Sequence, residues 1–104
     1  MLEFLKNIGI NDRTILKMIN ENSEAVIQDL ECNSDNAVDI IDYLKELDIK
    51  VIDELLVDRI DLFLKTKREI MKLFSKFNIA DLVKEINDDY FNIDYIFEEN
   101  DWIY

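Results

Sequence analysis

The scarcity of helix-breaking residues is the feature that most restricts how this chain can fold. Its 104 residues include no proline and one glycine, Gly9. Proline ends or kinks a helix because it lacks a backbone N–H, and glycine weakens a helix through its conformational entropy. Apolar residues also recur at the helical spacing of three and four, as at Ile40, Ile41, Leu44 and Leu47. The sequence therefore predicts an all-α protein.

Polar residues whose side chains can accept hydrogen bonds from backbone N–H groups indicate where these helices begin. Asp12 is expected to cap a helix that runs to about Ile19. Ser23 is expected to cap the next helix, which runs to about Glu31. Segment 32–36 is polar apart from its cysteine, and we expect it to be the longest loop.

A capping box marks another helix start further along the chain. Thr66 and Glu69 have its Thr-x-x-Glu spacing and predict a helix that runs to about Phe77. We expect six to eight short helices in one domain, residues 1–104, because a chain of this length is a single domain. Short helices are marginal alone, so they must pack as a compact bundle or as a short right- or left-handed stack.

One seven-residue pattern occurs three times. The copies are Phe-Leu-Lys-Asn-Ile-Gly-Ile at 4–10, Tyr-Leu-Lys-Glu-Leu-Asp-Ile at 43–49 and Leu-Phe-Ser-Lys-Phe-Asn-Ile at 73–79. Their penultimate residues tolerate the left-handed conformation that ends a helix; these are Gly9, Asp48 and Asn78. The pattern predicts repeated helix-turn-helix units, although short amphipathic helices with such ends also resemble one another without repetition.

The first copy and the residues after it resemble a repeat of the mitochondrial transcription termination factor family. Residues 4–30 carry the resemblance, in which a leucine-rich helix ends in a Gly-Ile turn and two further helices follow. The resemblance implies a stack of helical repeats. Ser23 or its neighbours stand where the family has a proline, and the acidic chain lacks the family's basic groove, so nucleic-acid binding is not expected to carry over.

Net charge restricts the partners of this chain. Twenty-four acidic and twelve basic residues give −12, divided as −9 over residues 1–58, +4 over 59–76 and −7 over 77–104. Such a field repels phosphate backbones and anionic membranes and speeds association with basic proteins. The alternative is that the charge serves solubility alone.

Side chains that usually carry catalysis are scarce. There is no histidine, and the one cysteine, Cys32, has no partner for a thiolate-based site. One glycine is too few for a glycine-rich phosphate loop. Carboxylates at Asp53, Glu54 and Asp58 could hold Mg²⁺ or Ca²⁺, but a solvated helix face explains them more simply. We therefore expect no enzyme activity, no cofactor and no metal.

The expected location is the cytoplasm, with no membrane attachment. Glu3 and Lys6 interrupt the first turns, so no signal-peptide pattern is present. The apolar runs are far shorter than the ~20 residues that span a bilayer. A single cysteine cannot form an intramolecular disulfide, so the fold needs no oxidising compartment.

The basic segment 59–76 is the exception to the acidic character. Its cations could contact phosphates, and Lys65, Lys72 and Lys76 fall on one face if the segment is helical throughout. Because the rest of the chain is so acidic, we expect these cations to pair with the chain's own carboxylates.

The C-terminal stretch is the most distinctive part of the sequence. Residues 90–104 hold six of the eleven aromatic side chains, and no Lys or Arg follows Lys84. Tyrosine and tryptophan are enriched at the energetic centres of protein interfaces, and carboxylates beside them suit a partner rich in Lys and Arg. Phe91 and Phe97 are expected to close the end of the helical core. The predicted contact residues are Asp94, Tyr95, Glu98, Asp101 and Trp102.

These features together resemble the profile of small acidic bacterial immunity proteins, which neutralise cationic nuclease toxins. Inhibitors that mimic nucleic acid share the profile. We therefore expect a protein-binding module that occludes a basic partner. Two alternatives remain: a small helical-repeat protein that binds nucleic acid through residues 59–76, and an adaptor that assembles with itself.

Overall fold

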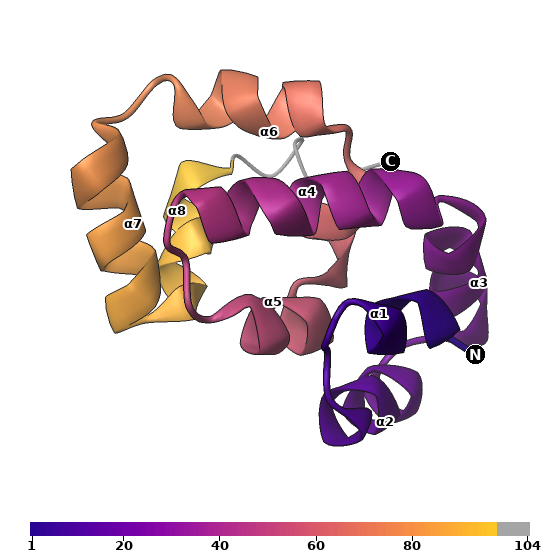
Figure 1. Ribbon diagram of the computed structural model, residues 1–104. Coiled ribbons are helices and arrows are strands. Elements are labelled where there is room, and N and C mark those ends of the chain that lie inside the picture. Colours follow the sequence, from indigo (N-terminus) through magenta and orange to yellow (C-terminus); the bar gives the residue numbers. More distant parts are fainter. Residues whose placement is uncertain (98–104) are drawn as a thin grey trace.

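Ten helical elements follow one another along the part of the chain that the structure, a computed structural model, describes, residues 1–97 (Figure 1). No strand occurs within those residues. The α-helices are α1 (Glu3–Asn7), α2 (Asp12–Glu21), α3 (Glu24–Cys32), α4 (Ser34–Glu46), α5 (Ile52–Asp58), α6 (Lys67–Phe74), α7 (Ile79–Asp88) and α8 (Ile93–Ile96). Two short 3-10 helices, η1 (Ile60–Leu64) and η2 (Tyr90–Asn92), connect them. The prediction of an all-α protein is confirmed.

The helices surround one core of buried apolar side chains. Helix α4 crosses its middle and buries Ile40, Ile41 and Leu44, while α5 contributes Leu55 and Leu56. The radius of gyration of 13.0 Å is that of a compact domain of about 100 residues. The arrangement is a compact helical bundle. Among the described residues, no helix has the length and apolar character needed to cross a membrane.

Side-chain caps begin four of the α-helices, each by accepting a hydrogen bond from the backbone N–H three residues ahead. The caps are Asn11 to Thr14 at 2.8 Å, Ser23 to Val26 at 3.2 Å, Thr66 to Glu69 at 3.1 Å and Asn78 to Asp81 at 3.1 Å. Ser23 and Thr66 are confirmed as caps. Asp12 was the wrong cap for α2: Asn11 takes that position, and Asp12 adds negative charge to the first turn, where the helix dipole favours it.

The predicted loop at 32–36 is wrong. Helix α3 ends at Cys32 and α4 begins at Ser34, so only Asn33 separates them. The Asn33 amide donates to the carbonyl of Asp29 at 2.8 Å, which satisfies the end of α3 within one residue. Asn36 lies inside α4 and donates to the backbone carbonyl of Lys65 at 2.5 Å. The polar side chain of Asn33 thus ends a helix and that of Asn36 makes a tertiary hydrogen bond, and neither belongs to a long loop.

Two of the three repeated patterns end in the same Schellman motif. Gly9 and Asp48 have φ values of +96° and +66°, in the left-handed region. The N–H of the following residue reaches back to close each turn, from Ile10 to the Leu5 carbonyl and from Ile49 to the Leu44 carbonyl, both at 3.0 Å. Ile10 and Ile49 are buried, so each packs back on the core.

The third pattern departs from the other two. Asn78 has φ −69° and ψ 119°, an extended conformation, because its side chain caps α7. Helix α6 ends at Phe74, three residues before the predicted Phe77. The Ser75 hydroxyl donates to the Lys72 carbonyl at 2.6 Å and satisfies that end. The predicted left-handed conformation at Asn78 is therefore wrong.

The two Schellman turns generate a prediction about stability. Replacing Gly9 with alanine should lower the free energy of unfolding by ~1–2 kcal/mol, because a Cβ is strained at this φ even where space is open. Replacing Asp48 with glycine should leave stability unchanged or raise it, since a side chain is removed from the same conformation. Urea denaturation of both variants measures the difference. A greater loss in Asp48→Gly than in Gly9→Ala would contradict this explanation.

Candidate functional site

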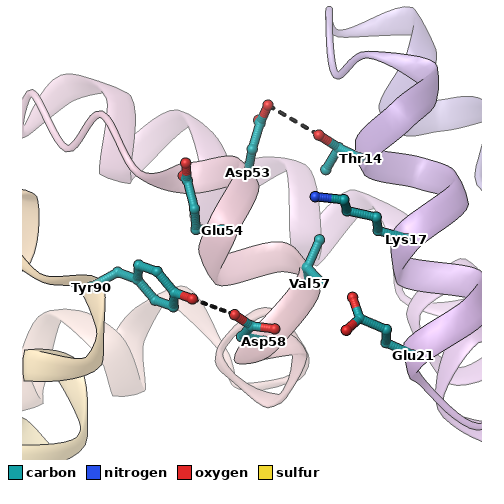
Figure 2. A pocket seen from close by; sticks show the side chains of 8 residues that line it. All are labelled: Thr14, Lys17, Glu21, Asp53, Glu54, Val57, Asp58 and Tyr90. Carbon is teal, nitrogen blue, oxygen red and sulfur yellow. Dashed lines mark hydrogen bonds between the residues drawn. The ribbon is translucent and has the colours of Figure 1, made fainter.

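An acidic cleft opens where α2 and α5 pack against each other. Its volume is about 320 Å³. Figure 2 shows side chains of both helices pointing into the same space, with a tyrosine from η2 at one edge. The lining residues are Thr14, Lys17, Glu21, Asp53, Glu54, Val57, Asp58 and Tyr90.

Helical periodicity brings these side chains together. On α2, Thr14, Lys17 and Glu21 follow one another at spacings of three and four, so they share one face. On α5, Glu54 and Asp58 are four residues apart and border the cleft from the other side. The inner faces of both helices are apolar and belong to the core, which holds the two polar faces in place.

Negative charge dominates the cleft. Asp53 accepts a hydrogen bond from the hydroxyl of Thr14 at 3.2 Å, and Asp58 accepts one from the phenol of Tyr90. Glu21 and Glu54 are exposed and have no hydrogen bond or ion pair to any described residue. Lys17 is the one cation in the lining. Two carboxylates therefore remain available to a cationic ligand.

Arg59, directly after α5, links this region to the C-terminal helices. Its guanidinium binds the carboxylate of Asp94 in α8 with two hydrogen bonds, each of 2.7 Å. It also donates to the carbonyl of Asp58 at 2.6 Å and lies 4.8 Å from the ring centre of Phe91. The hydrogen bonds to Asp94 raise the pKa of the guanidinium above its ordinary value. We call these contacts, with the Tyr90–Asp58 bond, the Arg59 latch.

Two further pKa values in this region are shifted. The hydrogen bond to Asp58 raises the pKa of Tyr90 to about 12, because the neutral phenol donates it. The Tyr90 ring also lies against that of Phe91, with 4.3 Å between centres. Burial raises the pKa of Asp61, which lines a neighbouring cleft of about 410 Å³. Asp58, Arg59 and Asp94 also line that second cleft, so the latch forms part of its wall.

The predicted contact residues fall into two groups. Asp94 and Tyr95 lie on α8, and the structure places Asp94 against Arg59. Tyr95 has 87% of its surface exposed, so it is available for contact. The three other predicted contact residues lie outside the described residues; these are Glu98, Asp101 and Trp102.

The basic segment divides in the structure. Arg59 pairs with Asp94 as expected, but Arg68, Lys72 and Lys76 form no ion pair with a described residue, so the expected pairing is wrong for these three cations. Lys65 is buried beside the ring of Phe97, 5.6 Å from its centre, so the predicted common face with Lys72 is wrong. Lys65 precedes α6 and is in an extended conformation, which breaks the assumed helical spacing. Phe97 is buried as predicted, but Phe91 is 45% exposed.

Sequence reasoning missed the contribution of α2 to the cleft. Lys17 and Glu21 have helical spacing, but that signal alone does not show that α2 lies beside α5. The carboxylates of α5 lie on a face that is solvent-accessible at Glu54 and Asp58, as predicted, but Asp53 and Asp58 also accept hydrogen bonds from other elements and form one wall of the cleft. Within residues 1–97, no three His, Cys, Asp or Glu side chains gather closely enough to hold a metal ion.

Comparison with known proteins adds no family to this geometry. No protein-family model, curated protein or solved structure matches the chain. The chemistry of the site must therefore be inferred from its own residues. An open cleft with two unpaired carboxylates, bordered by a tyrosine, suits a cationic side chain.

The Arg59 latch can be tested by mutation. Arg59→Ala should lower the free energy of unfolding by ~1–2 kcal/mol, since two charge-assisted hydrogen bonds and a ring contact are lost. Arg59→Lys should recover less than half of this loss, because an ammonium cannot bind a carboxylate in the same two-pronged geometry. A double-mutant cycle with Asp94→Ala measures the pair directly. Additive effects of the two substitutions would show that the pair contributes nothing.

The raised pKa of Tyr90 predicts a dependence on alkaline pH. The folded state favours the neutral phenol, so its hydrogen bond stabilises the fold fully below about pH 10 and is lost as pH rises through about 12. The difference between the ultraviolet titrations of the natural chain and Tyr90→Phe isolates this group. Asp58→Ala should return the pKa of Tyr90 toward the ordinary value. An unchanged pKa in that variant would contradict the assigned cause.

Proposed function

We propose that this chain is a protein-binding module that neutralises a basic partner, an inhibitor or immunity-type protein for a cationic nuclease. The observation that supports the proposal is the α2–α5 cleft, where Glu21 and Glu54 remain unpaired and the half-buried ring of Tyr90 lies against the exposed ring of Phe91. Lysine or arginine side chains of a partner are the natural occupants of such a cleft.

The Arg59 latch illustrates how this surface binds arginine. The guanidinium of Arg59 lines the second cleft, where it is held by Asp94 and by the ring of Phe91. Carboxylate and aromatic contacts to one guanidinium are favourable together. The first cleft offers similar groups, Glu54 and Tyr90, without an internal arginine. It is therefore the better candidate for a partner's cation.

Exposed rings supply the apolar contact that carboxylates alone lack. Phe91 and Tyr95 are 45% and 87% exposed, and both lie on the C-terminal elements beside the latch. A few aromatic anchors commonly carry most of the free energy of an interface. The net charge of −12 would add fast, salt-dependent association with a basic protein.

A second acidic surface provides a comparison. Helix α4 presents four exposed carboxylates along one stripe, at spacings of three and four residues: Asp35, Asp39, Asp42 and Glu46. This stripe lines neither of the two clefts described above. The stripe carries comparable charge, so variants on it can distinguish general electrostatic attraction from binding in the cleft.

The proposed location is the cytoplasm. Cys32 is exposed and is the chain's single cysteine. A reducing compartment would keep such a thiol free of intermolecular disulfides.

The test uses cationic nuclease domains, beginning with the product of any neighbouring nuclease gene. Glu21→Lys with Glu54→Lys should lower the association rate constant at least ~10-fold and relieve inhibition of the nuclease, because steering and the cleft contacts are both reversed. Asp35→Lys with Asp39→Lys makes the same change in net charge on α4 and should have a much smaller effect. Stopped-flow binding and a nuclease assay measure both.

Two outcomes would contradict the proposal. One is an equal fall in the association rate constant in the cleft and α4 variants, because net charge alone would then explain the binding. The other is a failure of the natural chain to bind any cationic nuclease tested. Tyr95→Ala, expected to raise the dissociation rate constant, tests the aromatic contact separately.

A further inference from the structure

Helix α6 presents a surface of opposite character to the rest of the molecule. Arg68 and Lys72 on α6, and Lys76 just after its end, are exposed, and none forms an ion pair with a described residue. Met71 and Phe77, between and beside them, are 47% and 41% exposed. We define these five residues as the basic α6 surface. Positive charge next to exposed apolar groups suits an acidic partner that also excludes water.

The core orients this surface outward. Ile70 and Phe74 are fully buried on the inner face of α6, where the helix packs on α4. Arg68, Met71 and Lys72 lie on the opposite face at spacings of three and four. The basic α6 surface is therefore a fixed feature of the fold.

The chain carries a complementary surface that the basic α6 surface cannot reach within one molecule. Figure 1 shows α6 and α2 at opposite ends of the molecule, with α4 and α5 between them. The unpaired carboxylates Glu21 and Glu54 line the cleft at the α2 end. One end of each molecule thus has unpaired cations on an exposed helix, and the other has unpaired anions in a recess.

We propose that the basic α6 surface docks into the α2–α5 cleft of a second copy of this chain. Arg68 and Lys72, one turn apart, would meet the carboxylates of Glu21 and Glu54. Met71 would be covered between them. The charges match in sign, and an exposed helix meets a concave site.

The geometry determines the kind of assembly. The two surfaces differ, so the contact is heterologous. In a dimer, one copy keeps a free cleft and the other keeps a free basic α6 surface. Copies can then add head to tail unless the rotation closes a ring. The net charge of −12 opposes association at a distance, but the Debye length is about 8 Å at physiological ionic strength, so charges in direct contact dominate.

The inference rests on the proposed function in one respect, the use of the cleft to bind cations. Self-association would then compete with a basic partner for the same carboxylates. The partner would bind the free cleft and shorten or dissociate the assemblies.

Sedimentation equilibrium at about 0.15 M salt, the ionic strength at which surface charges beyond ~8 Å are screened, tests the proposal on the full chain. The average mass of the natural protein should rise with concentration. Arg68→Glu with Lys72→Glu should weaken association at least ~10-fold, and Glu21→Lys with Glu54→Lys should do the same. Combining all four substitutions restores complementary signs and the natural net charge, so association should return.

Matched variants separate site from net charge. The cleft variant is matched in net charge by Asp35→Lys with Asp39→Lys. The basic-surface variant is matched by Lys45→Glu with Lys50→Glu. Both control variants should leave association nearly intact. Far-ultraviolet circular dichroism checks that every variant folds. A natural chain that stays monomeric up to about 1 mM, the weak limit of specific binding, would overturn the proposal. So would the absence of rescue in the fourfold variant.

Nucleic acid is the other occupant to test. Fluorescence anisotropy with a short DNA duplex and with single-stranded RNA at low salt measures it. One result would overturn self-association: the natural chain binds nucleic acid, Arg68→Glu with Lys72→Glu abolishes this binding, and the natural chain remains monomeric. The basic α6 surface would then be assigned to phosphate binding. The same double variant should still bind a cationic nuclease, so failure of this inference and of the proposed function can be told apart.

Discussion

Mutual burial of short amphipathic helices is the constraint on which the rest of the structure depends. The longest described α-helix, α4, has 13 residues, and helices of this length are marginal in isolation. Each one becomes stable by burying its apolar face against its neighbours, around a centre formed by α4 and α5. The same packing places every polar face, because a helix that buries one side must present the other to solvent.

The end of α5 shows how this packing creates a specific surface. Asp58 and Arg59 lie where α5 meets the C-terminal elements: Asp58 accepts a hydrogen bond from Tyr90, and Arg59 binds Asp94. Arg59 neutralises Asp94 of the same molecule at the surface, while Glu21 on α2 and Glu54 on α5 stay unpaired. The result is an acidic surface whose carboxylates differ in availability, although the sequence lists them all as equal charges.

Charge is separated along the molecule as well as along the chain. The cleft and the basic α6 surface lie at opposite ends, so they cannot neutralise one another in one copy. Arg59 and Lys65, which the sequence grouped with the α6 cations, are withdrawn from that surface by Asp94 and by burial beside Phe97. What remains exposed is a smaller cationic patch with apolar side chains, which favours a protein contact over a phosphate track.

Sequence alone determined the features that depend on near neighbours. The absence of proline and the apolar spacing specify an all-helical chain, and Ser23, Thr66, Gly9 and Asp48 act within a few residues of themselves, where local geometry decides. The predictions for Asn36 and Asn78 were wrong because each side chain has more than one possible hydrogen-bond partner, and the surrounding structure selects one. The hydrogen bonds of the cleft and the Arg59–Asp94 pair join residues 32 or more positions apart, such as Thr14 and Asp53. Only tertiary packing decided these, because the distance between two helix faces is set by the core between them and not by their spacing in the chain.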